Sequence, residues 1–271
     1  MRTPTLNGAS ATAPAQHGDH VALLEARHLV KAYGGNIAVA DVSLDLQASQ
    51  ILGIVGPNGA GKSTVGGLIA GSVHCDEGEV WLSGRRIDKL PRWQRARAGL
   101  SRTFQLSSEF ARLTVMENLL AGSELREFSS VRYGLLGRHR WKAVEERQVD
   151  HARALLHEFQ LERYENEYAN RLSGGQRRLV EIMRALMGQP KVLLLDEPMS
   201  GLNERMINEV GTHLARLRHE GLGMLLIEHN VDVVGAFADR VMALGEGRVL
   251  ASGTAEEVMT NEVVMNVYLR G

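Results

Sequence analysis

A glycine-rich loop that joins a fully apolar strand to a helix constrains this chain more than any other feature. The segment "ILGIV" (51–55) is continuously apolar, as in a strand buried on both faces of a sheet. It runs directly into "GPNGAGKST" (56–64), after which Val65, Leu68 and Ile69 recur at helical spacing. A strand, a loop of this spacing and a helix form the phosphate-binding arrangement called a P-loop. The loop therefore predicts an α/β protein that binds a phosphorylated ligand.

The residue types within this loop suit a nucleotide. Glycines allow backbone N–H groups to close around phosphates, Lys62 can reach the β- and γ-phosphate oxygens, and the Ser63 hydroxyl can bind Mg²⁺. The glycine spacing differs from the G-x-G-x-x-G pattern of dinucleotide sites. The flanking strand and helix argue against a chance glycine-rich turn. We expect phosphates to be bound by Gly56, Pro57, Asn58, Gly59, Ala60, Gly61, Lys62, Ser63 and Thr64.

Two carboxylates follow a second apolar segment, "KVLLLDE" (191–197). At the end of a buried parallel strand, Asp196 and Glu197 can point into the crevice beside the P-loop. Asp196 would then hold Mg²⁺ through water, and Glu197 would position and deprotonate an attacking water. The alternative is a solvated acidic turn, against which the four preceding aliphatic residues and the following Pro198 argue. The pair therefore predicts hydrolysis of the bound nucleotide.

A second phosphate-seeking turn occurs far along the chain, in "RLSGGQRRL" (171–179). Ser173 and Gln176 have the spacing of a capping box, which marks the start of a helix. Free N–H groups and the positive end of the helix dipole meet at such a terminus and attract anions. Ser173, Gly174, Gly175 and Gln176 are therefore further candidates for contact with nucleotide phosphates.

The remaining pattern predicts two kinds of β-structure and an inserted helical section. Half-buried antiparallel strands are expected over 41–46 and 78–84, and a further buried strand over 223–229. Also expected are helices over 141–160 and 204–219, capped helices from Thr114 and from Thr254, and a strand–turn–strand over 240–253. Buried strands that alternate with helices indicate an open, largely parallel α/β sheet. The predicted fold is thus an α/β core sheet of the P-loop NTPase type, an antiparallel β subdomain and an α-helical subdomain inserted at about 92–175.

Composition favours a soluble globular protein without a general affinity for nucleic acid. Of 271 residues 44% are hydrophobic, and the net charge is −1, so no global field attracts nucleic acid. Cys75 is the only cysteine, which excludes an internal disulfide and fits a reducing compartment. Residues 1–20 are small and polar, and no apolar run is long enough to span a bilayer. We expect a cytosolic protein with a disordered extension over 1–20 and one folded unit over 21–271.

Three of these motifs together resemble those of the ATP-binding subunits of ATP-binding cassette (ABC) transporters. They are Gly56–Thr64, the pentapeptide Leu172–Gln176 and the 192–197 strand with its Asp-Glu pair. Leu-Ser-Gly-Gly-Gln is the signature of that family, and the resemblance covers the chain from about residue 22 to its end. It implies the ABC ATPase fold, with ATP as the substrate, Mg²⁺ as the cofactor and hydrolysis coupled to transport.

The resemblance also implies roles for residues that local patterns alone would assign to packing or to loops. Tyr33 matches the aromatic residue that stacks on adenine, and Gln105 matches the glutamine that senses Mg²⁺ and the membrane subunit. His229 matches the switch histidine that contacts the γ-phosphate, and Ser200–Asn203 matches the loop that crosses to the partner subunit. The implied catalytic residues are Glu197, His229 and Gln105, and the implied metal-site residues are Ser63, Gln105 and Asp196.

The resemblance explains why one chain carries two phosphate-seeking turns. In the family, two subunits face each other head to tail, and each P-loop holds an ATP over which the other subunit's signature turn closes. One chain therefore carries two half-sites, in a symmetric arrangement that makes ATP part of the interface. The implied partners are a second ATP-binding subunit (identical or paralogous), two membrane permease subunits and, indirectly, a solute-binding protein, but no nucleic acid. The implied location is the cytoplasmic face of the inner membrane.

A finer resemblance is to the branched-chain amino acid importer type. It is carried by "RTFQLSSEFARLTVMENLLAG", the insertion over 123–140, "DEPMSGLN", "LLIEHN" and the C-terminal "VYLRG". Asn230 and Met199-Ser200 depart from that group's pattern, and importers of urea and short amides share it. The transported solute therefore stays open among these.

Two other classes of function compete with transport. Soluble ABC ATPases of translation or DNA repair commonly carry two cassettes or a long coiled-coil insertion, whereas this sequence has one cassette and a short helical insertion. An ordinary P-loop kinase or GTPase is disfavoured by the signature turn and by the lack of a guanine-reading N-K-x-D. Within the transport hypothesis, Gln105 and the aromatic stretch over 123–140 are predicted to dock the membrane subunits.

Overall fold

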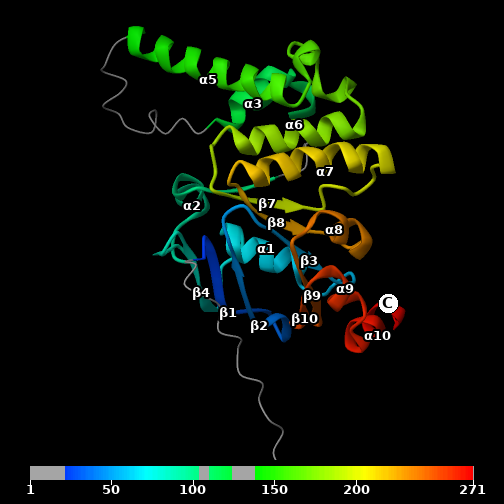
Figure 1. The fold of residues 1–271 in the computed structure, drawn as a ribbon. Coiled ribbons are helices and arrows are strands. Elements are labelled where there is room, and N and C mark those ends of the chain that lie inside the picture. Colours follow the sequence, from blue (N-terminus) through cyan, green and yellow to red (C-terminus); the bar gives the residue numbers. More distant parts are fainter. Residues whose placement is uncertain (1–21, 104–109, 124–137, 271) are drawn as a thin grey trace, which may run out of the picture.

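The computed structural model describes residues 22–103, 110–123 and 138–270 (Figure 1). The predicted extension over 1–20, Gln105 and most of the 123–140 stretch lie outside these residues. None of the helices in the described part of the chain is both long enough and apolar enough to cross a membrane.

A six-stranded sheet with the order β10-β9-β3-β8-β7-β6 forms the centre of the molecule. Its strands are β3 (Ile51–Val55), β6 (Leu100–Arg102), β7 (Val192–Asp196), β8 (Gly223–Ile227), β9 (Arg240–Gly245) and β10 (Arg248–Gly253). All neighbours pair in parallel except β10, which turns back against β9. Every residue of β3 and β8 is buried, as expected for apolar strands covered on both faces. The predicted, largely parallel sheet is thus confirmed.

A second sheet is antiparallel, with the order β2-β1-β4-β5. It consists of β1 (Leu24–Tyr33), β2 (Asn36–Leu46), β4 (Glu77–Leu82) and β5 (Arg85–Arg86). Alternate residues of β2, among them Val42, Leu44 and Leu46, are buried, which agrees with the half-buried pattern of the sequence. The helix α1 (Lys62–Ala70) lies between the two sheets and contacts strands of both (Figure 1).

Helices cover the opposite face of the central sheet. They include α6 (Gly174–Leu186), α7 (Glu204–His219) and α8 (Val231–Phe237), whose apolar side chains share one buried cluster with those of β7 and β8. The chain ends in two helices, α9 (Ala255–Met259) and α10 (Glu262–Arg270), on β9 and β10. A capping box at Thr254 starts α9 as predicted, but Thr260 and Asn261 separate it from α10, whose first turn Asn261 caps in its place.

The helical section contains α3 (Val115–Gly122), α5 (Arg138–Glu158) and the start of α6, with short 3-10 helices at Phe110–Arg112, Glu162–Tyr164 and Ala169–Arg171. Both predicted capping boxes are present, at Thr114 before α3 and at Ser173 before α6. The predicted range of 92–175 begins too early for this section, because α2 (Arg92–Ala98) leads into β6, which is the edge strand of the central sheet.

Candidate functional site

The order of the parallel strands gathers the chemistry-bearing segments at one edge of the central sheet. Strand β8 lies between β3 and β7, and all three are parallel, so their carboxyl ends meet on the same side. The P-loop follows β3, Glu228 and His229 follow β8, and Asp196 ends β7, with Glu197 directly after it. Ligand sites of open α/β sheets lie in the crevice outside such strand ends. The structure therefore brings together the two motifs that the sequence placed far apart.

The P-loop glycines occupy positions that a side chain would not fit. A Cβ atom on Gly56 would lie 2.3 Å from the carbonyl oxygen of Leu244. Gly61 has a φ of 95°, in the left-handed region, and its Cβ would lie 2.5 Å from the carbonyl oxygen of Ala38. Gly61 also begins α1, whose first N–H groups thus open toward the loop. The loop has the compact backbone that a phosphate-binding turn needs.

Lys62 folds back over the loop. Its side chain is 5% exposed, and Nζ donates to the carbonyl oxygens of Gly56 at 2.7 Å and of Pro57 at 3.0 Å. Burial lowers the pKa of Lys62, while Glu197, Asp196 and then Glu228 act in the opposite direction. These couplings show that all three carboxylates lie within electrostatic reach of the P-loop lysine. A phosphate could replace the two carbonyl acceptors without requiring a new position for the lysine.

The carboxylates of Asp196, which ends β7, and Glu197, which follows it, have different surroundings. Oδ2 of Asp196 pairs with Nη2 of Arg102 at 2.5 Å, a partner that the sequence reasoning did not foresee. Glu197 has a φ of 47°, which is unusual for a residue with a side chain and costs about 1–3 kcal/mol. Its N–H donates to Ile227 at 2.9 Å, and its carbonyl oxygen accepts from Arg178 at 3.2 Å. The strained backbone is therefore held on both sides.

The end of β8 contributes one exposed and one buried side chain. The His229 side chain is half-exposed, and its Nδ1 lies 3.7 Å from Oε2 of Glu228. Glu228 is 1% exposed, and its Oε1 accepts from the N–H of Met199 at 2.7 Å. Burial raises the pKa of Glu228 above the usual range of a glutamate. The sequence analysis missed Glu228, although a carboxylate directly after five apolar residues was the available signal.

The signature turn has the predicted capping box. Ser173 Oγ accepts from the N–H of Gln176 at 3.2 Å, and Gln176 Oε1 accepts from the N–H of Ser173 at 2.9 Å. Gln176 Nε2 donates to the Tyr164 hydroxyl at 2.8 Å, so this amide already has partners at both ends. Ser173 and Gly174 remain exposed at the first turn of α6. A cavity of about 470 Å³ is lined by Gly174 of this turn and by the loop over 200–202.

The position of Tyr33 fits a place beside the P-loop. It ends β1 and pairs with Asn36, two residues before Ala38, whose carbonyl oxygen lies against Gly61. The ring is 51% exposed, with Lys31 Nζ 5.4 Å from its centroid. Among the residues predicted to bind the nucleotide or to catalyse its hydrolysis, Gln105 alone lies outside the described part of the chain.

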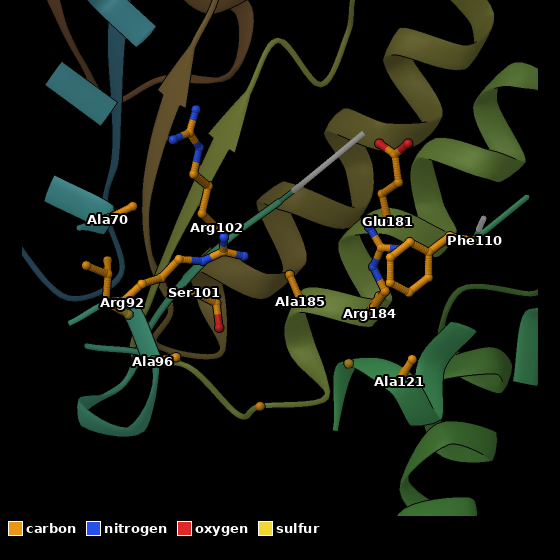
Figure 2. A pocket seen from close by; sticks show the side chains of 13 residues that line it. Ala70, Arg92, Ala96, Ser101, Arg102, Phe110, Ala121, Glu181, Arg184 and Ala185 are labelled. Carbon is orange, nitrogen blue, oxygen red and sulfur yellow. The ribbon is translucent and has the colours of Figure 1, made fainter. Parts of the chain in front are cut away.

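A second cavity, of about 300 Å³, lies where the central sheet meets the helical section. Figure 2 shows Arg92 and Arg102 on one side and Phe110 and Arg184 on the other. The guanidinium of Arg184 lies 4.3 Å from the centroid of the Phe110 ring. In the sequence, Arg102 and Phe110 stand before and after residues 104–109, which lie outside the described part of the chain.

Comparison with known proteins agrees with this arrangement. The family described as ABC transporter matches residues 39–200 of this chain. The lipopolysaccharide export system ATP-binding protein LptB of Haemophilus influenzae is 36% identical over 92% of this chain and 98% of its own length. The high-affinity branched-chain amino acid transport ATP-binding protein LivG of Salmonella typhimurium is 37% identical over 91% and 97%, respectively.

Solved structures show the same fold. A crystal structure of a nucleotide-free ATP-binding cassette from an ABC transporter has a TM-score of 0.82 and 32% identity, and the match covers 92% of this chain and 99% of that one. The combination of an antiparallel sheet, a parallel sheet and an inserted helical section is thus that of known ATP-binding cassettes. This chain therefore belongs to the ABC transporter family, as an ATP-binding subunit with ATPase activity.

Proposed function

We propose that this chain is the energy-coupling ATPase of a membrane transporter, and that two cassettes share two ATP molecules between them. The observation that carries the proposal is the exposed signature turn. Ser173 and Gly174 present the first turn of a long helix to solvent, while the P-loop stands at the edge of the central sheet. A helix terminus of this kind binds anions. A second cassette would bring such a turn to the nucleotide on the first.

The P-loop residues and Tyr33 would hold the nucleotide, with Lys62 on the β- and γ-phosphates. The hydroxyl of Ser63 and the carboxylate of Asp196 are hard oxygen donors of the kind that Mg²⁺ takes alongside substrate phosphates, and Gln105 is the third proposed metal-site residue. In the structure Oδ2 of Asp196 pairs with Nη2 of Arg102, so this carboxylate has a cationic partner. The metal would supply positive charge to the phosphates as their bonding changes.

Glu197 is the proposed general base. Its charge acts to raise the pKa of Lys62, which supports a carboxylate close enough to the phosphates to orient a water and accept a proton from it. His229, exposed at the end of the neighbouring strand, would contact the γ-phosphate. These two groups come from adjacent strands, so a shift of either strand end would change the distance between them.

We propose that the 300 Å³ cavity, together with the 123–140 stretch, docks the membrane subunits. Its lining includes Arg102, which pairs with Asp196, so a segment docked there would be connected to the proposed nucleotide site. Cysteine crosslinking tests this in the assembled transporter. Ala121→Cys, at the cavity, should crosslink to the membrane subunit in a Cys75→Ser background, whereas the exposed Thr212→Cys on α7 should not. Equal crosslinking of both would contradict docking at the cavity.

For the solute we propose branched-chain or other hydrophobic amino acids, imported with the help of a solute-binding protein, with this chain at the cytoplasmic face of the inner membrane. The similarity to LivG and the C-terminal "VYLRG" support this. Import of urea or short amides is the alternative within the same type. Export of lipopolysaccharide is a second candidate, favoured by the equally similar LptB.

Isolation of the transporter and an uptake assay test these assignments together. A tagged chain should co-purify with polytopic membrane proteins from native membranes. A strain without the gene should lose uptake of radiolabelled leucine and regain it with the wild-type chain but not with Lys62→Ala. Loss of urea uptake alone would favour the alternative importer, and a lipopolysaccharide defect would favour export. Isolation of a soluble complex with ribosomes or DNA would contradict transport.

A further inference from the structure

The carboxylate of Glu228 joins two segments that the proposed chemistry uses separately. It directly follows β8 and precedes His229, and it accepts a hydrogen bond from the N–H of Met199, two residues after Glu197, which follows β7. The Met199–Glu228 distance of 2.7 Å is at the short end of the range for a hydrogen bond from a backbone N–H. The side chain of Glu228 therefore bridges the ends of neighbouring strands.

Both partners of this bond are shielded from water. Glu228 is 1% exposed and Met199 is 3% exposed, so water cannot replace either partner. A buried N–H that loses its acceptor bears its full desolvation penalty, and the chain would move to find another. The chain that would move carries Glu197 on one side and the loop over 200–203 on the other.

Glu197 depends on such external support. Its φ of 47° is held by its own N–H on Ile227 and by Arg178 on its carbonyl oxygen. These two contacts hold the backbone N–H and the carbonyl group of Glu197. The bond from Glu228 holds the backbone two residues later, at Met199. Oε2 of Glu228 lies 3.7 Å from Nδ1 of His229, so the same carboxylate also lies beside the histidine that is proposed to contact the γ-phosphate.

We propose that Glu228 is a positioning residue for ATP hydrolysis, which holds Glu197, the 200–203 loop and His229 in one fixed arrangement through its bond to the Met199 N–H. It acts through these groups and does not itself contact ATP. The proposal rests on the proposed roles of Glu197 and His229. It adds that Glu228 fixes the positions of these two residues relative to each other. Catalysis depends on such fixed positions of the reacting groups.

Three substitutions at this position separate the bond from the charge. Glu228→Gln keeps an acceptor oxygen at the same reach, Glu228→Asp keeps the charge but withdraws the oxygen by one methylene, and Glu228→Leu removes both at similar volume. We expect kcat of Glu228→Gln to stay within about threefold of wild type, and that of Glu228→Leu to fall about 10- to 100-fold. Glu228→Asp should fall below Glu228→Gln. The KM for ATP should change little in all three, because the P-loop is intact.

Asp239 supplies a matched control on the same sheet. Its Oδ2 accepts from the N–H of Ile51 at 2.8 Å, at the opposite end of β3 from the P-loop. Asp239→Val therefore removes a carboxylate bond to a strand N–H, together with the ion pair of Asp239 with Arg218, far from the site. It should lower the unfolding midpoint as Glu228→Leu does, but leave kcat unchanged. If kcat of both variants falls in step with stability, the role of Glu228 is merely structural and the proposal is wrong.

The remaining outcomes are equally decisive. Wild-type kcat in Glu228→Leu, or a Glu228→Asp variant more active than Glu228→Gln, would overturn the proposal. Should Glu228→Leu not fold, the comparison of Glu228→Gln with Glu228→Asp decides alone. Glu197→Gln measured alongside separates this inference from its basis. If Glu197→Gln still hydrolyses ATP at the wild-type rate, the proposed site fails, whereas an inactive Glu197→Gln beside a fully active Glu228→Leu refutes only the role of Glu228.

Discussion

At the scale of single residues, Tyr33 offers a direct comparison. Its ring is 51% exposed at the end of β1 and lies on the P-loop side, whereas Tyr168 is 46% exposed in the helical section. Each has a cationic side chain over its ring. If Tyr33 stacks on the adenine, Tyr33→Ala should weaken ATP binding by about 1–3 kcal/mol. Tyr168→Ala, the matched control, should bind ATP as wild type does in a calorimetric titration. If the affinity of Tyr33→Ala for ATP is unchanged, Tyr33 does not stack on the adenine and its role is in packing.

The buried carboxyl of Glu228 predicts a pH dependence of stability. Burial raises the pKa of Glu228 in the folded state, so between the unfolded pKa, about 4.3, and the raised value the folded state binds more protons. The stabilisation from this carboxyl is thus complete below the unfolded pKa and is lost as pH rises through the folded pKa. Glu228→Gln does not titrate, so its free energy of unfolding relative to wild type should increase with pH across this window and then level off. Urea unfolding from pH 4 to pH 8 measures this, and a constant difference would contradict it.

Sequence reasoning at this scale found residues with a known pattern and missed those whose role depends on a partner. Ser173 and Gln176 were identifiable because a capping box is local. The ion pair of Arg102 with Asp196 joins residues 94 positions apart, and no spacing rule indicates it. Glu228 was hidden for the same reason, because a charged residue at a strand end usually faces water.

At the scale of elements, long apolar strands were predictable and short edge elements were not. The strands β3, β7 and β8 are buried on both faces, so their sequences carry a continuous apolar signal. The edge strand β6 has three residues, of which only Leu100 is buried, and its place is set by pairing with β7 rather than by its own pattern. This is why residues 92–102 were assigned to the helical section.

The contact between α3 and α6 gives a testable element-level prediction. Gly122 ends α3 against α6, and a Cβ atom there would lie 2.1 Å from the carbonyl oxygen of Arg184. Because this obstacle is backbone, the helices must separate, and Gly122→Ala should lower the free energy of unfolding by about 1–3 kcal/mol. Gly35, which has no atom within 4 Å of its Cβ position, is the control, and Gly35→Ala should lie within about 0.5 kcal/mol of wild type. Equal urea midpoints for the two variants would contradict the close packing.

At the scale of the whole molecule, the two anion-binding turns lie on different parts of the chain. The P-loop and the carboxylates stand at the edge of the central sheet, and the signature turn is exposed at the start of α6 beside the 200–203 loop. Because the family and fold are shown, the pairing of two chains around ATP is the claim on which coupling to transport depends. ATP would hold the pair closed for as long as its γ-phosphate remains.

The most direct test is the oligomeric state of Glu197→Gln, measured by light scattering with and without ATP. This substitution keeps size and hydrogen bonding but removes the basic carboxylate, so chemistry should slow while binding persists. We expect a monomer without nucleotide, a dimer with ATP, and a monomer again when Ser173→Arg is added to block the signature turn. If the pair requires a paralogous cassette, the same dimer should form when that cassette is supplied. Dimers that form without ATP, or that survive Ser173→Arg, would contradict an ATP site shared between two chains.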